Sequence, residues 1–99
     1  MAADNGGAMR ILVVEDELIL REGLVDLLEA AGHEVVAVGD GLTAVERGVG
    51  EAFDMVVLDW MLPRLEGPEV CRRLRLARPG LPVSMLTARG AEGDKVDGL

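Results

Sequence analysis

Cysteine, basic residues and long apolar runs are all scarce in this sequence. The 99-residue chain has one cysteine, Cys71, so it cannot form an internal disulfide, which argues against a secreted disulfide scaffold. No apolar run approaches the about 20 residues of a transmembrane helix, and the first nine residues have no features of a secretory signal. Lysine and arginine number 10 against 18 aspartates and glutamates, and the net charge of −8 repels nucleic-acid phosphates and anionic membranes. We therefore expect a soluble, cytoplasmic chain that binds neither nucleic acid nor membrane directly.

The length and composition indicate a single globular domain. Hydrophobic residues make up 49% of the chain and charged residues 28%, a balance that is ordinary for globular proteins. Residues 1–9 are small, polar and glycine-containing, and we expect them to form a flexible lead-in. The domain itself is predicted to occupy residues 10–99.

Four short apolar runs predict buried strands at residues 11–14, 35–38, 55–58 and 83–86. These runs are apolar at nearly every position instead of alternating, which is typical of parallel strands buried on both faces. Helical patterns separate the runs, and the β-α-β-α-β-α-β order implies right-handed crossovers with helices on both faces of the sheet. The predicted fold class is α/β, an open parallel-sheet three-layer sandwich.

Three helices are expected between the strands. The first has leucines at positions 20, 24, 27 and 28, which we expect to face inward, and Gly32 follows as its stop. The second, over about residues 42–49, is interrupted by Gly48. The third begins near Pro68, buries Val70, Leu74 and Ala77, and ends at Pro79.

Carboxylates follow two of the predicted strands. Glu15, Asp16 and Glu17 come after the first strand, and Asp59 comes after the third. If these strands are neighbours, the side chains of Glu15, Asp16 and Asp59 converge, and a divalent cation such as Mg²⁺ would offset their mutual repulsion. Thr87 ends the fourth strand on the same rim, so phosphoryl transfer onto Asp59 is the chemistry that fits. Glu17 is better explained as a solvated residue or as a cap of the next helix.

The segments ILVVEDE, VVLDWMLPRLEG and PVSMLTA, at these separations, resemble the receiver domain of bacterial response regulators. The resemblance implies a flavodoxin-like fold with strand order 2-1-3-4-5, and a signalling module in place of a metabolic enzyme. It implies that Asp59 accepts a phosphoryl group from a histidine kinase and that Thr87 is the switch hydroxyl. It further implies that Glu15 and Asp16, together with Asp59 and the backbone carbonyl of Met61, hold Mg²⁺.

The chain departs from this family at its end, because the strand 5 segment with its lysine and the last helix are absent. We therefore expect strand order 2-1-3-4, and we interpret the chain as the N-terminal part of a longer OmpR-like, winged-helix regulator that controls transcription. The exposed fourth strand favours a homodimer or a swapped dimer. Leu18 and Ile19 either dock the kinase helix bundle or pack against the missing helix.

Two other functions stay open on the residues alone. Gly39, Gly41 and Ala44 follow a strand with dinucleotide-fingerprint spacing, which would make the chain a nucleotide-binding module. The chain could instead be a non-catalytic fragment that acts only in protein–protein interaction. His33 is expected to be an exposed turn residue and Cys71 a boundary residue of the core.

Overall fold

The computed structural model describes residues 7–86, which form four strands and three helices. In chain order these are β2 (Arg10–Val14), α1 (Leu18–Ala30), β3 (Glu34–Val38), α2 (Gly41–Gly50), β4 (Met55–Asp59), α3 (Gly67–Ala77) and β5 (Val83–Leu86). Each predicted strand and helix is present. The predicted end of the fourth strand at Thr87 lies outside the described residues.

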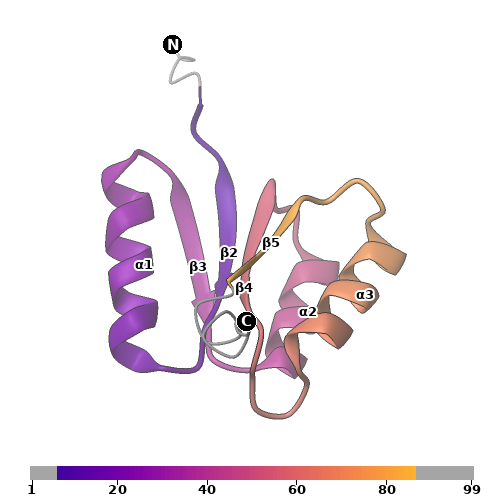
Figure 1. Ribbon diagram of the computed structural model, residues 1–99. Helices are drawn as coiled ribbons and strands as arrows, with labels where there is room; N and C mark the ends of the chain where they lie inside the picture. Colours follow the sequence, from indigo (N-terminus) through magenta and orange to yellow (C-terminus); the bar gives the residue numbers. More distant parts are fainter. Residues whose placement is uncertain (1–6, 87–99) are drawn as a thin grey trace, which may run out of the picture.

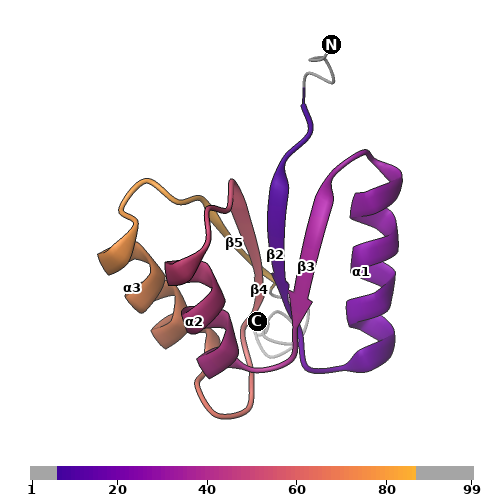
Figure 2. The ribbon, with the colours of Figure 1, turned by 180° about the vertical axis from the view of Figure 1, so that it is seen from behind.

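The four strands form one parallel sheet in the order β3-β2-β4-β5. In chain order this is 2-1-3-4, as the sequence predicted. Helix α1 covers one face of the sheet, and α2 and α3 lie side by side on the other (Figures 1 and 2). The predicted three-layer sandwich is therefore confirmed, and all four strands point their carboxyl ends toward one edge of the sheet.

The core has two parts, one on each face of the sheet. The larger part joins the side chains of β2 and β4 to those of α2 and α3, with Leu12, Leu58 and Leu74 fully buried. The smaller part contains Ile11, Val13 and Val57 of the sheet, against which α1 packs. Strands with apolar side chains on both faces are what a sheet covered by helices on both sides requires.

The inward face of α1 is narrower than the sequence predicted. Leu24 and Leu28 pack on the sheet, but Leu20 is 42% exposed and Leu27 is 66% exposed. Adjacent residues of a helix point about 100° apart, so Leu27 cannot share the inward line that Leu24 and Leu28 occupy. Gly32 ends the helix as predicted, with φ of 97° and an N–H that donates to the Glu29 carbonyl.

Helices α2 and α3 approach each other closely at Gly48. The sequence interpretation of Gly48 as an interruption was wrong, because α2 runs through it to Gly50. A Cβ atom at position 48 would lie 2.4 Å from Leu74 Cδ2, so only glycine leaves room for this leucine. In α3, Val70 and Leu74 are fully buried as expected, whereas Ala77 is exposed because it lies in the last turn, beyond the contact with α2.

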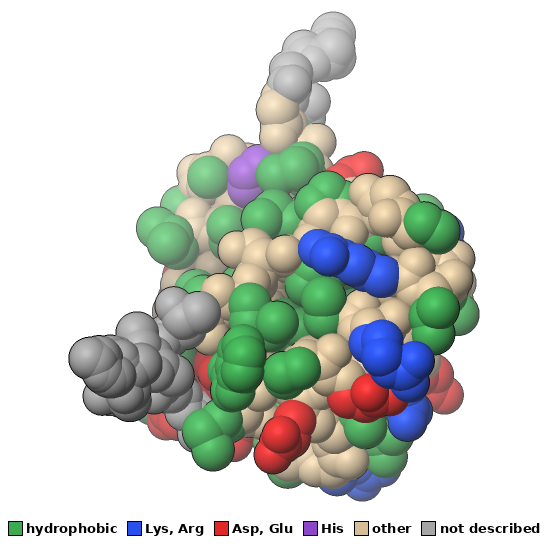
Figure 3. Space-filling model, turned by 45° about the vertical axis from the view of Figure 1, so that its right-hand side comes forward, with side chains coloured by type: hydrophobic (Ala, Val, Ile, Leu, Met, Phe, Trp, Pro, Cys, Tyr) green, Lys and Arg blue, Asp and Glu red, His purple; other side chains and the backbone are tan. Residues whose placement is uncertain are grey.

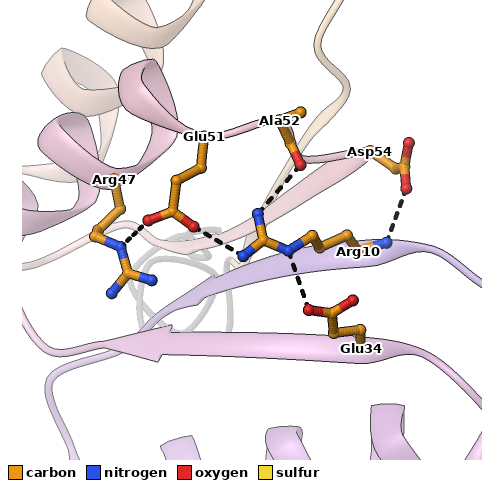
Figure 4. Close-up of polar contacts among 6 residues, drawn as sticks. All are labelled: Arg10, Glu34, Arg47, Glu51, Ala52 and Asp54. Atoms are coloured by element: carbon orange, nitrogen blue, oxygen red, sulfur yellow. Dashed lines mark hydrogen bonds and ion pairs between the residues drawn. The ribbon is translucent and has the colours of Figure 1, made fainter.

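Arg10 links several elements at the edge of the sheet opposite the strand carboxyl ends (Figure 4). Its guanidinium donates to Glu34 of β3 at 3.2 Å, to Glu51 after α2 at 2.8 Å and to the Ala52 carbonyl at 3.3 Å. The same group lies over the Phe53 ring, 4.7 Å from its centroid. Arg10 therefore links β2 to β3 and to the segment after α2, and its positive charge pairs with the carboxylates of Glu34 and Glu51.

Two residues outside the acidic cluster, His33 and Cys71, make contacts that support the fold. His33 is half-buried instead of exposed, because its Nδ1 accepts a hydrogen bond of 3.0 Å from the Met9 N–H. Cys71 is a half-buried thiol packed against the larger core, as predicted. Within residues 7–86, no helix is both long and apolar enough to cross a membrane.

Candidate functional site

The carboxyl ends of β2 and β4 bring three acidic side chains together. The two strands are paired, with Val14 opposite Leu58, so the next residues, Glu15 and Asp59, emerge side by side. Glu15, Asp16 and Asp59 each place a carboxylate oxygen within 4.8 Å of the others. The sequence predicted this convergence on the condition that the two strands are neighbours, and the sheet register is its cause.

Three hydrogen bonds hold Glu15, two through its backbone and one through its side chain. Its N–H donates to the Val38 carbonyl at 3.1 Å, which continues the β2–β3 pairing by one residue. Its carbonyl accepts a hydrogen bond of 3.0 Å from the Arg21 guanidinium. Its carboxylate accepts one of 3.0 Å from the Glu17 N–H. Glu15 is therefore fixed in position before any ligand binds.

The three acids differ in their exposure to water. Glu15 and Asp59 are buried, at 0% and 1% exposure, whereas Asp16 is exposed. Burial raises the pKa of Glu15, and the negative charges of Asp59 and Asp16 add to this rise, while the hydrogen bond from Glu17 opposes it. A bound cation would remove the cost of keeping these charges together.

The donor set suits a hard divalent cation. Carboxylate oxygens are the ligands that Mg²⁺ prefers, and Mg²⁺ needs only one or two of them because it keeps several waters. The exposed Asp16 leaves the cluster open to solvent on one side, where such waters would lie. No histidine or cysteine belongs to the cluster, which disfavours a zinc site here.

The loop after β4 folds back tightly onto the site. Gly67 donates its N–H to the Trp60 carbonyl at 2.8 Å, and a Cβ atom at position 67 would lie 2.5 Å from the Asp59 carbonyl oxygen. Arg64 in this loop has φ of 71°, a conformation that is uncommon for residues other than glycine. The backbone of this loop is thus packed against the end of β4, and Met61, whose side chain is half exposed, lies within it.

Several predicted residues have clear positions. Glu17 caps α1, because its Oε1 accepts a hydrogen bond of 2.8 Å from the Leu20 N–H, and this bears out its interpretation as a cap. Leu18 is 51% exposed and Ile19 is 72% exposed, both in the first turn of α1 beside the acids. Thr87 lies outside the described residues.

The glycines of the predicted nucleotide fingerprint have other tasks. The Gly41 N–H donates to the Pro63 carbonyl at 3.3 Å, and a Cβ atom there would lie 2.0 Å from the Leu65 carbonyl oxygen. The Thr43 N–H donates to the Asp40 side chain at 2.8 Å, which caps α2. Since these amides are already used and a neighbouring loop covers Gly41, the start of α2 is not built to bind a pyrophosphate.

The sequence did not identify Arg21 as a residue that positions Glu15. Its side chain crosses from α1 to the Glu15 carbonyl and lies 3.0 Å from where a Cβ atom of Gly39 would be. The sequence signal that could have identified Arg21 is its position as a single basic residue, four positions after the capping Glu17 and beside an acidic cluster.

Comparisons with known proteins agree with this geometry. A family model described as "Response regulator receiver domain" matches residues 11–99. The transcriptional regulatory protein TcrA of Mycobacterium tuberculosis is 52% identical over 98 residues, which are 99% of this chain and 39% of TcrA. The chain therefore spans about two fifths of the length of this curated relative.

Solved structures are similar in fold as well. The receiver domain of the sensor histidine kinase PA1611 from Pseudomonas aeruginosa, with a magnesium ion coordinated in its active-site cleft, has a TM-score of 0.82 at 30% identity and covers 90% of this chain and 75% of its own. A complex of the histidine kinase ThkA with the response regulator protein TrrA contains a chain with a TM-score of 0.75 at 34% identity, covering 80% of this chain and 68% of its own.

Proposed function

Because the chain belongs to the response regulator receiver domain family, we propose that it is a phospho-acceptor signalling domain whose phosphorylated residue is Asp59. The observation that supports this most is the buried Asp59 carboxylate at a strand end, with the carboxylates of Glu15 and Asp16 within 4.8 Å. Such a domain relays a signal and is not a metabolic enzyme.

The proposed chemical step is a phosphoryl transfer from a phosphohistidine of a kinase. One oxygen of the Asp59 carboxylate attacks the phosphorus, an O–P bond forms, and the P–N bond breaks. The electron pair stays on the imidazole nitrogen, which then takes up a proton, and Asp59 becomes an acyl phosphate. Burial of Asp59 restricts the access of water to the product.

Glu15 and Asp16 would hold Mg²⁺ beside Asp59, and the Met61 backbone carbonyl would complete the protein ligands. When bound, Mg²⁺ supplies positive charge that neutralises the oxygens of the transferred group. Glu15 is positioned for this by its hydrogen bonds with Glu17 and Arg21. Thr87 would donate its hydroxyl to the phosphoryl group and draw the segment after β5 toward the site.

The partner is proposed to be a histidine kinase that docks beside the acids on Leu18 and Ile19. These exposed apolar side chains lie in the first turn of α1, next to the site that the phosphohistidine must reach. The ThkA–TrrA complex supports a kinase as the class of partner.

The output is proposed to be control of transcription in the cytoplasm, as the description of TcrA as a transcriptional regulatory protein suggests. An OmpR-like DNA-binding domain elsewhere in the complete protein would carry it out, with no nucleic-acid contact by residues 10–99. A homodimer, including one swapped through β5, would bring two such outputs together.

The proposal is tested by incubating the chain with acetyl phosphate and Mg²⁺ and recording its intact mass. We expect one added phosphoryl group, lost at alkaline pH as acyl phosphates are, and absent in Asp59→Asn. The matched control is Asp26→Asn, an exposed carboxylate of α1, which should be modified like the wild type. A folded wild-type chain that gains no phosphoryl group, or an Asp59→Asn variant that still gains it, would leave the non-catalytic interaction domain as the better account.

A further inference from the structure

A groove of about 430 Å³ lies between α1 and β3, and its lining includes none of the three clustered acids Glu15, Asp16 and Asp59. Leu18, Val25 and Ala37 give it apolar surface, and Glu22 and Asp26 line it with acidic groups. Strand β3 is at the edge of the sheet, so this side of the molecule is open (Figure 1). We call this feature, with these lining residues and Arg21, the α1–β3 groove.

The helix beside the groove has an acidic outer stripe. Glu22, Asp26 and Glu29 follow one another at spacings of four and three residues, so they lie on one side of α1, and all three are exposed. Among the ion pairs of residues 7–86, none includes any of the three. The one basic residue of α1, Arg21, is turned toward the Glu15 carbonyl. The stripe therefore presents uncompensated negative charge.

Helix α3 presents the opposite chemistry on the far side of the sheet. Arg72, Arg73 and Arg75 are exposed, and Leu76 among them is 70% exposed. Glu69 pairs with Arg72 at 2.6 Å and with Arg73 at 2.8 Å, but it is the only acid of this helix, so α3 keeps a net charge of about +2 in a chain of net charge −8. In Figure 3, which turns the α3 side forward, blue arginine and green hydrophobic side chains are exposed together.

We infer that the chain associates with copies of itself, the arginine face of α3 in one copy docking into the α1–β3 groove of the next. The groove has apolar surface with acids along it, and the α3 face has an apolar side chain, Leu76, with arginines around it. Leu76 would enter the groove, while Arg72 and Arg75 would pair with Glu22 and Asp26. Both the apolar and the charged groups are complementary.

The geometry of the fold makes this contact intermolecular and head-to-tail. Helices α1 and α3 lie on opposite faces of the sheet (Figures 1 and 2), so one molecule cannot join its own two surfaces. Since the two surfaces are different, each copy can bind one neighbour through α3 and another through the groove. The contact is small and rich in exposed charge, so it should be weak and sensitive to salt.

The association does not involve phosphoryl transfer, so its test is independent of the test of the proposed function. It does cover Leu18, which lines the groove and is also a proposed kinase contact. A self-associated copy would thus present less of that contact to a kinase.

The experiment is sedimentation equilibrium of the chain over a range of concentrations at low ionic strength and at about 0.5 M salt. We expect the average mass of the wild type to rise with concentration at low salt and to return toward the monomer at high salt. Two charge-reversed variants, Arg72→Glu with Arg75→Glu and Glu22→Arg with Asp26→Arg, should each bind themselves at least about tenfold more weakly, because like charges then face each other. Mixing the two variants should restore association.

Controls keep the result interpretable. Glu46→Arg with Glu66→Arg changes the net charge as the groove variant does, but at exposed positions outside both surfaces, and should not abolish association. Leu76→Ser, at a 70% exposed position, should weaken association without loss of helical circular dichroism. The inference is overturned if the wild type stays monomeric at low salt, if both charge-reversed variants associate as well as the wild type, or if their mixture does not associate.

Discussion

Replacing Glu15 by Gln should stabilise the protein when no divalent cation is present. Glu15 is fully buried, and oxygens of the Asp16 and Asp59 carboxylates lie within 4.8 Å. At 4.8 Å, and at the effective dielectric constant of about 20 that suits protein sites, two unit charges repel by about 3.5 kcal/mol. The hydrogen bond from the Glu17 N–H to the charged carboxylate offsets about 1.5–3 kcal/mol of this. Asp16 is exposed, so water screens its repulsion to about 1 kcal/mol. The two repulsions less the hydrogen bond leave an expected net gain of about 1.5–3 kcal/mol for Glu15→Gln.

The dependence of this gain on pH has a definite sign. The folded state raises the pKa of Glu15 above its ordinary value of 4.5, so the unfolded chain loses this proton first as the pH increases. The contribution of Glu15 to stability is therefore present below about pH 4.5 and is lost as the pH rises through the raised pKa. The advantage of Glu15→Gln should accordingly be small in acid and should grow as the pH rises through the raised pKa of Glu15.

The assay is urea unfolding followed by circular dichroism, in EDTA and then in saturating Mg²⁺. In EDTA at neutral pH the variant should unfold at a higher urea concentration than the wild type. Mg²⁺ should reduce or reverse this difference, because only the complete cluster binds it tightly. Glu29→Gln, an exposed acid of α1, is the matched control and should match the wild type. The reasoning fails if Glu15→Gln is the less stable protein in EDTA, or if Mg²⁺ stabilises both proteins equally.

Three further predictions concern the scaffold, each measured as the free energy of unfolding in urea. Gly48→Ala should cost about 1–3 kcal/mol, because the new Cβ meets Leu74 Cδ2 at 2.4 Å. Gly23→Ala in α1 should instead stabilise by about 0.5–1 kcal/mol, because its new Cβ meets nothing within 4 Å. Equal effects of the two would contradict the packing account. Arg10→Met should lower the free energy of unfolding, because its hydrogen bonds to Glu51 and to the Ala52 carbonyl are lost, and an unchanged free energy of unfolding would show that these contacts are dispensable. Glu17→Ala should cost about 1 kcal/mol by removing the α1 cap, and an unchanged unfolding curve would refute that role.

The strands and the acidic site could be predicted because their signals are local. Runs such as residues 11–14 and 55–58 are apolar at every position, which fits buried parallel strands, and the acids directly follow those runs. Once the resemblance to receiver domains implied the strand order, the sheet register was enough to bring Glu15 beside Asp59.

The roles of the glycines could not be predicted, because they depend on residues far away in the chain. Gly48 is needed for the approach of Leu74, and Gly41 for the approach of the Leu65 backbone. The spacing of Gly41 also matches a nucleotide fingerprint, and the sequence alone does not say whether a phosphate or a neighbouring loop lies over it. The exposure of Leu27 was missed for a related reason, since helical spacing does not give the width of the face that the sheet covers.

One measurement tests directly whether the three carboxylates form one cation site that serves Asp59. Trp60 is the only tryptophan, is adjacent to Asp59 and is 42% exposed, so its fluorescence reports on this site. Titration with Mg²⁺ should give a saturable change in the wild type and in the control Glu46→Gln, and none in Asp16→Asn. A folded wild-type chain without a saturable change, or an Asp16→Asn variant that responds like the wild type, would contradict a shared cation site.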